Sequence, residues 1–308
     1  MIQDIMPSVY HVEYRNELPV PEACLIGVEG HSIYMKKVGE NLEFLHFFDL
    51  IDENGTEKKD EGFCTYNDAV NYLFKIDQTS YFLVDPVGEN HEKLLNRIKH
   101  TENIVPVGMG EFRGLRPVWK SFAGVTAIQL NSWYQNRRFC GRCGSMMKKS
   151  QTERAMVCPE CGLIEYPKIS PAVIIGITNG DKLLMTKYAD RDFKKYALVA
   201  GYTEIGEDFE ATIRREVMEE VGLKVKNITY YKSQPWSFSD TILAGFFCQL
   251  DGSDEYHIDT NELAIAEWLT RDQLPRRDSD IALTSDMIEA FRTKTYPMYA
   301  EWEGKQGN

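Results

Sequence analysis

Apolar runs separated by short polar turns mark the second half of the chain. The segment SPAVIIGITNGDKLLMTKY (170–188) has two apolar runs around Asn179-Gly180-Asp181, a pattern that predicts a β-hairpin. Further strands are predicted at 197–202, 228–236, 242–250 and within ELAIAEWLTRDQLP (262–275). Helical periodicity predicts one helix through 211–221 and another through 282–296. Interleaved strands and helices indicate an α/β sandwich.

The first half mixes strand-like and helical stretches, as expected of an α+β domain. Strands are predicted around LIGVEGHSIYMKK (25–37) and TSYFLVDPVG (79–88), and an exposed loop at DENGTEKKDEG (52–62). A helix is predicted over 124–139, with Ile128, Leu130, Trp133 and Tyr134 as its apolar positions. We therefore expect three domains: 1–137, a Cys-, Gly- and Lys-rich insert at 138–167, and 168–308.

Composition narrows the class of protein. The net charge of −12 argues against non-specific adhesion to nucleic acid or anionic lipid. No apolar run reaches the length of a membrane span, and the first residues lack the pattern of a secretory signal. Seven cysteines, with Cys24, Cys64 and Cys248 scattered and four in two CxxC pairs, fit a reducing compartment. We expect a cytoplasmic protein without a membrane partner.

The two CxxC pairs are the strongest metal signal. Fourteen residues separate Cys140 and Cys143 from Cys158 and Cys161. Each pair spans a tight turn, where Gly144 and Gly162 relieve backbone strain, and two facing turns complete a closed tetrahedral zinc site. A closed site is structural, since no position is left for water. The alternative is four unrelated buried or redox thiols.

The same insert is the most basic part of the chain. A zinc ribbon can bind nucleic acid, and a basic run can equally be a solvated face. The residues concerned are Arg137, Arg138, Arg142, Lys148 and Lys149.

The helix through 211–221 carries a cluster of glutamates. With about 3.6 residues per turn, Glu216, Glu219 and Glu220 project from one face. Ile213, Val217 and Val221 lie on the neighbouring face and can pack on a sheet, Arg215 can pair with Glu219, and Gly222 suits the helix end. Clustered carboxylates suit Mg²⁺ or Mn²⁺ facing a diphosphate. By composition alone, a solvated charged helix is the alternative.

The spacing of these residues resembles the signature of the Nudix hydrolases, G-x5-E-x7-R-E-U-x-E-E-x-G-U, where U is a bulky aliphatic residue. Every fixed position between 201 and 223 matches: Gly201, Glu207, Arg215, Glu216, Val217, Glu219, Glu220, Gly222 and Leu223. The resemblance implies an α/β/α sandwich. It also implies hydrolysis of a nucleoside diphosphate linked to another moiety, with the helix carboxylates holding divalent metal and Glu220 as first choice for the base.

A second stretch, SQPWSFSDTIL (233–243), resembles the NADH pyrophosphatase signature SQPWPFPxS. Ser237 and Ser239 replace two prolines and Thr241 replaces the last serine, so this loop should be less rigid. That family also carries a four-cysteine zinc ribbon, which ends in a Tyr-Pro like Tyr166-Pro167 here. The similarity covers the chain from about residue 127, and residues 1–126 resemble the family only in length and position.

This second resemblance implies the reaction of NAD(H) with water to NMN(H) and AMP, and removal of NAD caps from RNA 5′ ends. It implies base stacking by Tyr166 and Tyr202, and a commonly homodimeric enzyme. Glu262 matches a further metal ligand beside Glu216, Glu219 and Glu220. Gln234, Trp236 and Phe238 are further candidate substrate-binding residues, and for the two aromatic side chains loop packing is the alternative.

Two other functions stay open. One is hydrolysis of ADP-ribose or dinucleoside polyphosphates, which the SQPW stretch disfavours. The other is a zinc-ribbon nucleic-acid-binding regulator with a ligand-sensing Nudix domain, which the complete glutamate set disfavours.

Overall fold

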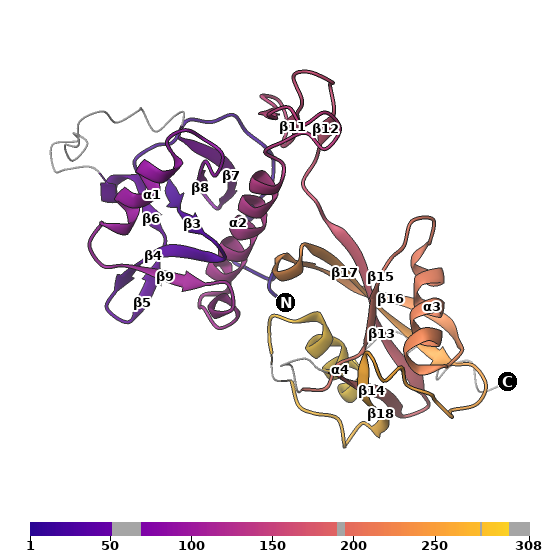
Figure 1. Ribbon diagram of the computed structural model, residues 1–308. Coiled ribbons are helices and arrows are strands. Elements are labelled where there is room, and N and C mark those ends of the chain that lie inside the picture. The colour runs from indigo at the N-terminus through magenta and orange to yellow at the C-terminus, as the bar shows by residue number, and fades with distance from the viewer. Residues whose placement is uncertain (51–68, 190–194, 278, 296–308) are drawn as a thin grey trace. The chain divides into compact units, whose positions relative to one another are not determined.

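A computed structural model describes residues 1–50, 69–189, 195–277 and 279–295. The chain divides into two compact units (Figure 1). One unit comprises Asp4–Lys168, and the other joins Met1–Gln3 to the residues from Ile169 onward. The predicted loop at 52–62 lies outside the described residues, as does the last residue of the helix predicted over 282–296.

The unit that starts at Ile169 is built on one mixed sheet of six strands, in the order β16-β17-β13-β14-β18 with β15 paired to β13. β13 and β17 run parallel, and the other neighbours are antiparallel. The predicted hairpin is confirmed, because Asn179 pairs with Lys182 across the turn. The strands are β13 (Ser170–Asn179), β14 (Lys182–Tyr188), β15 (Val199–Tyr202), β16 (Val225–Trp236), β17 (Thr241–Leu250) and β18 (Leu263–Thr270).

Alternation along β13 explains the layers on this sheet. Val173, Ile175 and Ile177 share a core with the apolar face of α3 (Phe209–Val221). Ile174 points to the opposite face and shares a second core with Met287 of α4 (Leu283–Thr293). The two helices therefore cover opposite faces of the sheet (Figure 1). The predicted α/β/α sandwich is confirmed.

The unit Asp4–Lys168 is α+β. One sheet has the order β1-β7-β8-β2-β6, a second joins β3-β4-β5 with β9 on β4, and a small third sheet is β10-β11-β12. Leu94, Leu95 and Ile98 of α1 pack on the first sheet with Phe82. The strands are β1 (Tyr10–His11), β2 (Cys24–Ile26), β3 (Val28–Glu29), β4 (Ser32–Val38), β5 (Asn41–Glu43), β6 (Leu45–His46), β7 (Val70–Ile76), β8 (Thr79–Val84), β9 (Ile104–Gly108), β10 (Lys148–Lys149), β11 (Met156–Val157) and β12 (Ile164–Glu165). The helices are α1 (His91–Lys99) and α2 (Val118–Asn136).

Helix α2 begins six residues before the predicted start at Gly124, and the prediction of its start was wrong. Gly124 resembles a helix boundary in the sequence, yet it lies inside α2. A Cβ atom there would lie 2.2 Å from Cε1 of Phe112, so the glycine allows the ring to pack against the helix backbone. Glycine is therefore needed here for close packing against the Phe112 ring, and not to form a turn.

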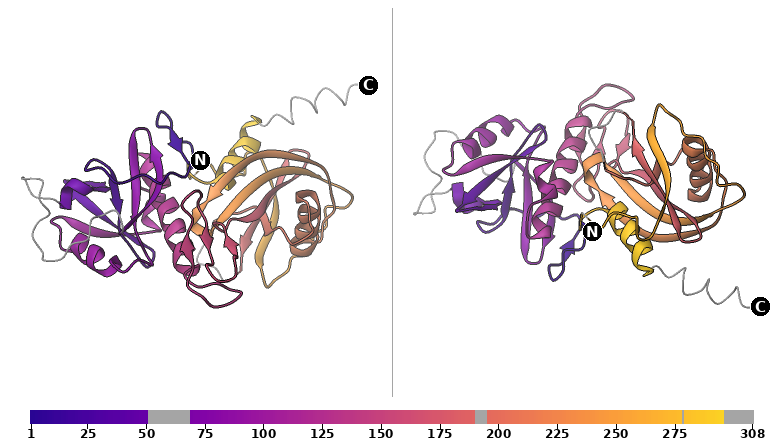
Figure 2. Two further views of the ribbon diagram at one scale, coloured as in Figure 1. Left: turned by 90° about the horizontal axis from the view of Figure 1, so that it is seen from above. Right: turned by 90° about the horizontal axis from the view of Figure 1, so that it is seen from below.

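The first residues of the chain belong to the sandwich. The Ile2 side chain is 1% exposed, and its N–H donates to the Ile281 carbonyl at 3.0 Å, directly before α4. Figure 2 shows the N-terminus beside the yellow segment that carries α4. No helix within the described ranges combines the length and apolar character needed to cross a bilayer.

Candidate functional site

The two CxxC turns have the same backbone design. In the first, the Cys140 N–H donates to the Ser145 carbonyl and the Gly144 N–H donates back to the Cys140 carbonyl. In the second, Cys158, Leu163 and Gly162 repeat this arrangement. Gly144 and Gly162 have φ of +77° and +71°, a left-handed conformation that glycine adopts without strain.

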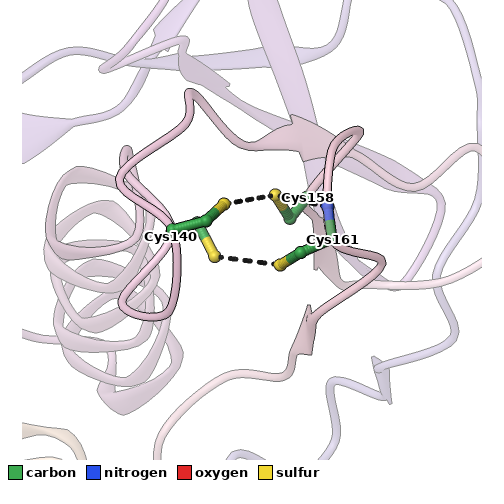
Figure 3. A group of neighbouring side chains, drawn as sticks. Cys140, Cys158 and Cys161 are labelled. Carbon is green, nitrogen blue, oxygen red and sulfur yellow. Dashed lines mark hydrogen bonds between the residues drawn. The ribbon is translucent and has the colours of Figure 1, made fainter.

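These turns bring four thiols together (Figure 3). Sγ atoms lie 3.6 Å apart for Cys140 and Cys161, and 3.4 Å apart for Cys143 and Cys158. All four lie within 4.8 Å of one another. Thiolates about 2.3 Å from a tetrahedral zinc are about 3.8 Å apart, so the cluster fits this ion with little adjustment. The Ser145 hydroxyl and amide lower the pKa of the Cys143 thiol to about 6, toward the thiolate that binds zinc.

The basic residues of this insert have separate roles. Lys149 forms an ion pair with buried Asp85, and its Nζ donates to Asn71 Oδ1 at 2.5 Å. Arg137 faces Glu165 at 3.4 Å, and Arg138 lies over the Phe139 ring. Arg142 and Lys148 are exposed. Part of the predicted basic surface is therefore used within the unit.

The glutamate-rich helix α3 is defined by its ends. Asp208 is the N-cap, since its Oδ1 accepts from the Ala211 N–H at 2.7 Å. Gly222 ends the helix, as predicted. It has a φ of +69°, and its N–H donates to the Met218 carbonyl. Ile213, Val217 and Val221 are fully buried against the sheet. This anchoring fixes the direction of the glutamates between them.

Arg215 is the positive centre of the glutamate cluster. Its Nε and Nη2 donate to both oxygens of Glu207, at 2.7 and 2.9 Å. Its Nη1 donates to Glu216 at 2.7 Å and to Glu219 at 3.0 Å. The remaining contact is to the Tyr202 carbonyl at 3.0 Å. One guanidinium thus holds three carboxylates and the end of β15, including the predicted pair with Glu219.

Glu216 lies directly over the backbone of β15. A Cβ atom at Gly201 would lie 1.9 Å from the Glu216 carboxyl carbon and 2.0 Å from its Oε1. Only glycine leaves this space. Burial raises the pKa of Glu216, Arg215 opposes that rise, and the charges of Glu219 and Glu262 add to it. Negative charge therefore converges on this carboxylate.

The other carboxylates differ in exposure. Glu220 is 3% exposed, whereas the Glu219 side chain is 59% exposed. Glu262 directly precedes β18, and its carbonyl accepts from the Ala189 N–H. Within the described ranges, the four cysteines are the one group of three or more Cys, His, Asp or Glu side chains whose ligand atoms already converge. The glutamates supply hard oxygen donors of the kind that Mg²⁺ prefers, in a looser arrangement.

The predicted substrate residues fall into two groups. Tyr202, Trp236 and Phe238 lie at the surface of the sandwich: Tyr202 is 53% exposed, and the Trp236 and Phe238 rings are 4.7 Å apart. The Tyr202 hydroxyl lies 3.4 Å from that of Thr241. Tyr166 belongs to the other unit, is exposed, and donates to Glu153 at 3.3 Å. The stacking roles stay predictions.

Gln234 has a different environment from its neighbours in the SQPW segment. Its side chain is fully buried. Its Nε2 donates to the Ile281 carbonyl at 2.6 Å, and its Oε1 accepts from the Leu283 N–H at 2.7 Å, the first residue of α4. This placement favours a structural role over the predicted contact with substrate. Sequence reasoning missed Gln3, which donates to the Ser233 carbonyl at 3.0 Å, because no motif marks it.

Family comparisons agree with this geometry. Residues 168–291 match the NUDIX domain family. The chain carries a Nudix domain. Residues 135–166, directly before it, match the NADH pyrophosphatase zinc ribbon domain. The four cysteines are therefore those of a zinc ribbon, and both predicted resemblances are confirmed.

Relatives cover the chain in part. The NAD-capped RNA hydrolase NudC of Pectobacterium atrosepticum is 40% identical over 162 residues, which are 53% of this chain and 62% of that protein. The protein of the same name from Salmonella heidelberg is 40% identical over 148 residues, 48% of this chain and 57% of that one. The chain thus spans less than two thirds of these relatives' length. The crystal structure of a NUDIX hydrolase from Nitrosomonas europaea aligns with a TM-score of 0.45 at 20% identity, covering 51% of this chain and 91% of that one.

The Glu207–Arg215 pair of the Nudix domain predicts an acid-sensitive contribution to stability. Hydrogen bonds from Arg215 and from the Glu204 N–H lower the pKa of Glu207 to about 2. Unfolded glutamate titrates near about 4.3, so the contribution is complete above that pH and is lost as pH falls toward about 2. We expect the difference in unfolding midpoint between wild type and Glu207→Gln to be largest above pH 5 and to shrink below pH 4. Chemical denaturation across that range measures it, and a constant difference would contradict it.

Gly201→Ala is expected to lower kcat of the Nudix domain by about 10²-fold, because the new methyl group displaces the Glu216 carboxylate and small misplacements at a site have effects of this size. Gly206→Ala is the matched control. Gly206 lies in the following loop at φ +94° with no neighbour within 4 Å, so its substitution strains the backbone without touching the glutamate. The measurement is kcat of the two variants under steady-state conditions, compared at equal folded fraction. Equal losses would show that loop strain is responsible.

Proposed function

We propose that this chain is a metal-dependent pyrophosphatase that hydrolyses NAD(H) to NMN(H) and AMP and removes NAD caps from RNA 5′ ends. The observation that carries the proposal is the complete Nudix glutamate set, organised by Arg215 over Gly201, in a chain that also contains the NADH pyrophosphatase zinc ribbon. Relatives named NAD-capped RNA hydrolase support the choice of substrate.

The acidic residues have two roles in the proposed reaction, metal binding and proton transfer. Glu216, Glu219, Glu220 and Glu262 would hold Mg²⁺ or Mn²⁺, which when bound neutralises the diphosphate and favours ionisation of water. Glu220 accepts a proton from the attacking water. The oxygen adds to the AMP-side phosphorus, the bond to the bridging oxygen breaks, and NMN(H) leaves. Arg215 orients Glu216 and Glu219, and its positive charge offsets the repulsion between their negative charges.

The substrate contacts are proposed from exposure. Tyr202, Trp236 and Phe238 offer partly exposed rings for base stacking within the Nudix domain, and Tyr166 offers one on the ribbon unit. A homodimer and a cytoplasmic location belong to the same proposal. None of the six described cysteines forms a disulfide, and four of them converge at the zinc ribbon, which supports a reducing compartment.

Product analysis in H₂¹⁸O tests the reaction. Purified protein with NADH and Mg²⁺ or Mn²⁺ should yield NMNH and AMP in equal amounts, with ¹⁸O in AMP alone. Label in NMNH would place the attack on the other phosphorus. ADP-ribose and NAD-capped RNA are compared in parallel. Faster cleavage of ADP-ribose would favour the other Nudix activity, and no metal-dependent cleavage of any of the three would favour a ligand-sensing role.

A further inference from the structure

Residues 1–3 form a small docking segment on the Nudix domain. The Ile2 side chain is buried, and the Ile2 N–H donates to the Ile281 carbonyl. Met1 packs against the core that contains α4. The Gln3 side chain reaches β16, where its Nε2 donates to the Ser233 carbonyl at 3.0 Å. β16 is an edge strand with one neighbour, β17, so Gln3 covers a backbone group on its outer side.

This docking segment joins the network around Gln234. The Gln234 amide lies 3.4 Å from Gln3 Oε1, and it also donates to the Ile281 carbonyl. Its oxygen accepts from the Leu283 N–H. The carbonyl of Ile281 therefore accepts from both Ile2 and Gln234. The end of β16, the start of α4 and residues 1–3 are held in one arrangement.

The same end of β16 leads on toward the candidate site. Trp236 and Phe238 follow Gln234 and pack on each other, and Thr241 then approaches the Tyr202 hydroxyl. The Tyr202 carbonyl binds Arg215, which holds Glu216. A continuous path thus runs from Gln3, through the β16–β17 turn at residues 235–241, to the glutamate cluster.

We propose that Gln3 is a positioning residue of the Nudix site, which fixes the β16–β17 turn, residues 235–241, and with it the Trp236 and Phe238 rings for the substrate. The expected change in KM rests on the proposed function. The expected structural change does not, because amide exchange at residues 233–241 can be measured without substrate turnover.

Gln3→Met tests the proposal because methionine keeps the length of the side chain and removes its hydrogen bonds with Ser233, Gln234 and Met1. We expect faster backbone amide exchange in peptides covering 233–241, with exchange in α3 unchanged. Met6→Ala is the control, since Met6 is 91% exposed and follows three residues later. Unchanged exchange at 233–241 in Gln3→Met would overturn the positioning role, whatever the activity of the protein.

Kinetics then test the consequence for substrate. If wild type cleaves NADH, Gln3→Met should raise KM about fivefold or more and change kcat less than twofold. In a Trp236→Ala background, Gln3→Met should have a smaller effect on KM than in wild type, because one of the two rings that it positions is gone. An unchanged KM in the single variant, or multiplied effects in the double variant, would overturn the inference. Absence of cleavage by wild type would overturn the proposed function instead, and the exchange experiment would still decide the role of Gln3.

Discussion

Replacing Glu220 with glutamine is expected to lower kcat for NADH hydrolysis by about 10²–10⁴-fold, the range in which general bases contribute. Glutamine keeps the shape of the side chain, but it neither carries the negative charge nor accepts a proton. The fold should survive, because glutamine has almost the same volume and the apolar residues that anchor α3 on the sheet are unchanged. Removing one of several neighbouring negative charges relieves repulsion, so the unfolding midpoint should stay equal or rise.

Glu210→Gln provides the matched comparison for this substitution. Glu210 lies in the first turn of the same helix and is exposed. The charge change is the same, and its carboxylate is not one of the three that Arg215 holds. Its kcat should stay within twofold of wild type. A Glu220→Gln enzyme that retained more than a tenth of wild-type kcat would remove Glu220 from the role of base. Glu216 and Glu219 would then be tested in the same way.

Cys158→Ala is expected to remove zinc from the ribbon and to unfold it. Binding of structural zinc contributes about 10–16 kcal/mol in small zinc domains, as much as the whole stability of many domains. Metal analysis of purified protein should give one zinc per chain for wild type and less than about 0.1 for the variant, since three thiolates leave the tetrahedral site incomplete.

Cys248→Ala is the control for loss of a buried thiol. Cys248 is completely buried in β17, and burial raises the pKa of its thiol above its usual range, as expected for an inert cysteine. Its substitution leaves a small cavity that should lower stability by about 1–2 kcal/mol and leave the zinc content unchanged. Full zinc content in Cys158→Ala would mean that the four cysteines are not the zinc site.

The sequence predicted those features that depend on neighbours along the chain. The glutamate helix follows from its period and from Gly222, the hairpin from its Asn-Gly turn, and the zinc ribbon from the spacing of Cys140 to Cys161. Each signal is local, because the residues that act together lie within a few turns or one loop of each other. The sandwich followed from the alternation of strands and helices.

Features that depend on distant partners were not predictable in this way. Gln234 belongs to a motif associated with substrate. Its side-chain amide nevertheless forms hydrogen bonds with Ile281 and Leu283, which lie 47 and 49 positions further along the chain. Lys149 looks like a solvated cation, but its partner Asp85 lies 64 residues earlier. Gly124 looks like a boundary, and only the Phe112 ring explains it. Such contacts are set by tertiary packing, which leaves no periodic trace in a single sequence.

The docking of Met1–Gln3 has a consequence for how this protein can be divided. A fragment cut to begin at Ile169 would contain all of the Nudix match except its first residue, Lys168. It would still lack the buried side chain of Ile2 beside α4 and the Ile2 N–H that donates to the Ile281 carbonyl. The compact unit that carries the Nudix match is therefore discontinuous along the chain. A designer who needs it alone would have to graft Met-Ile-Gln back through a short linker, so that the new connection replaces residues 4–168.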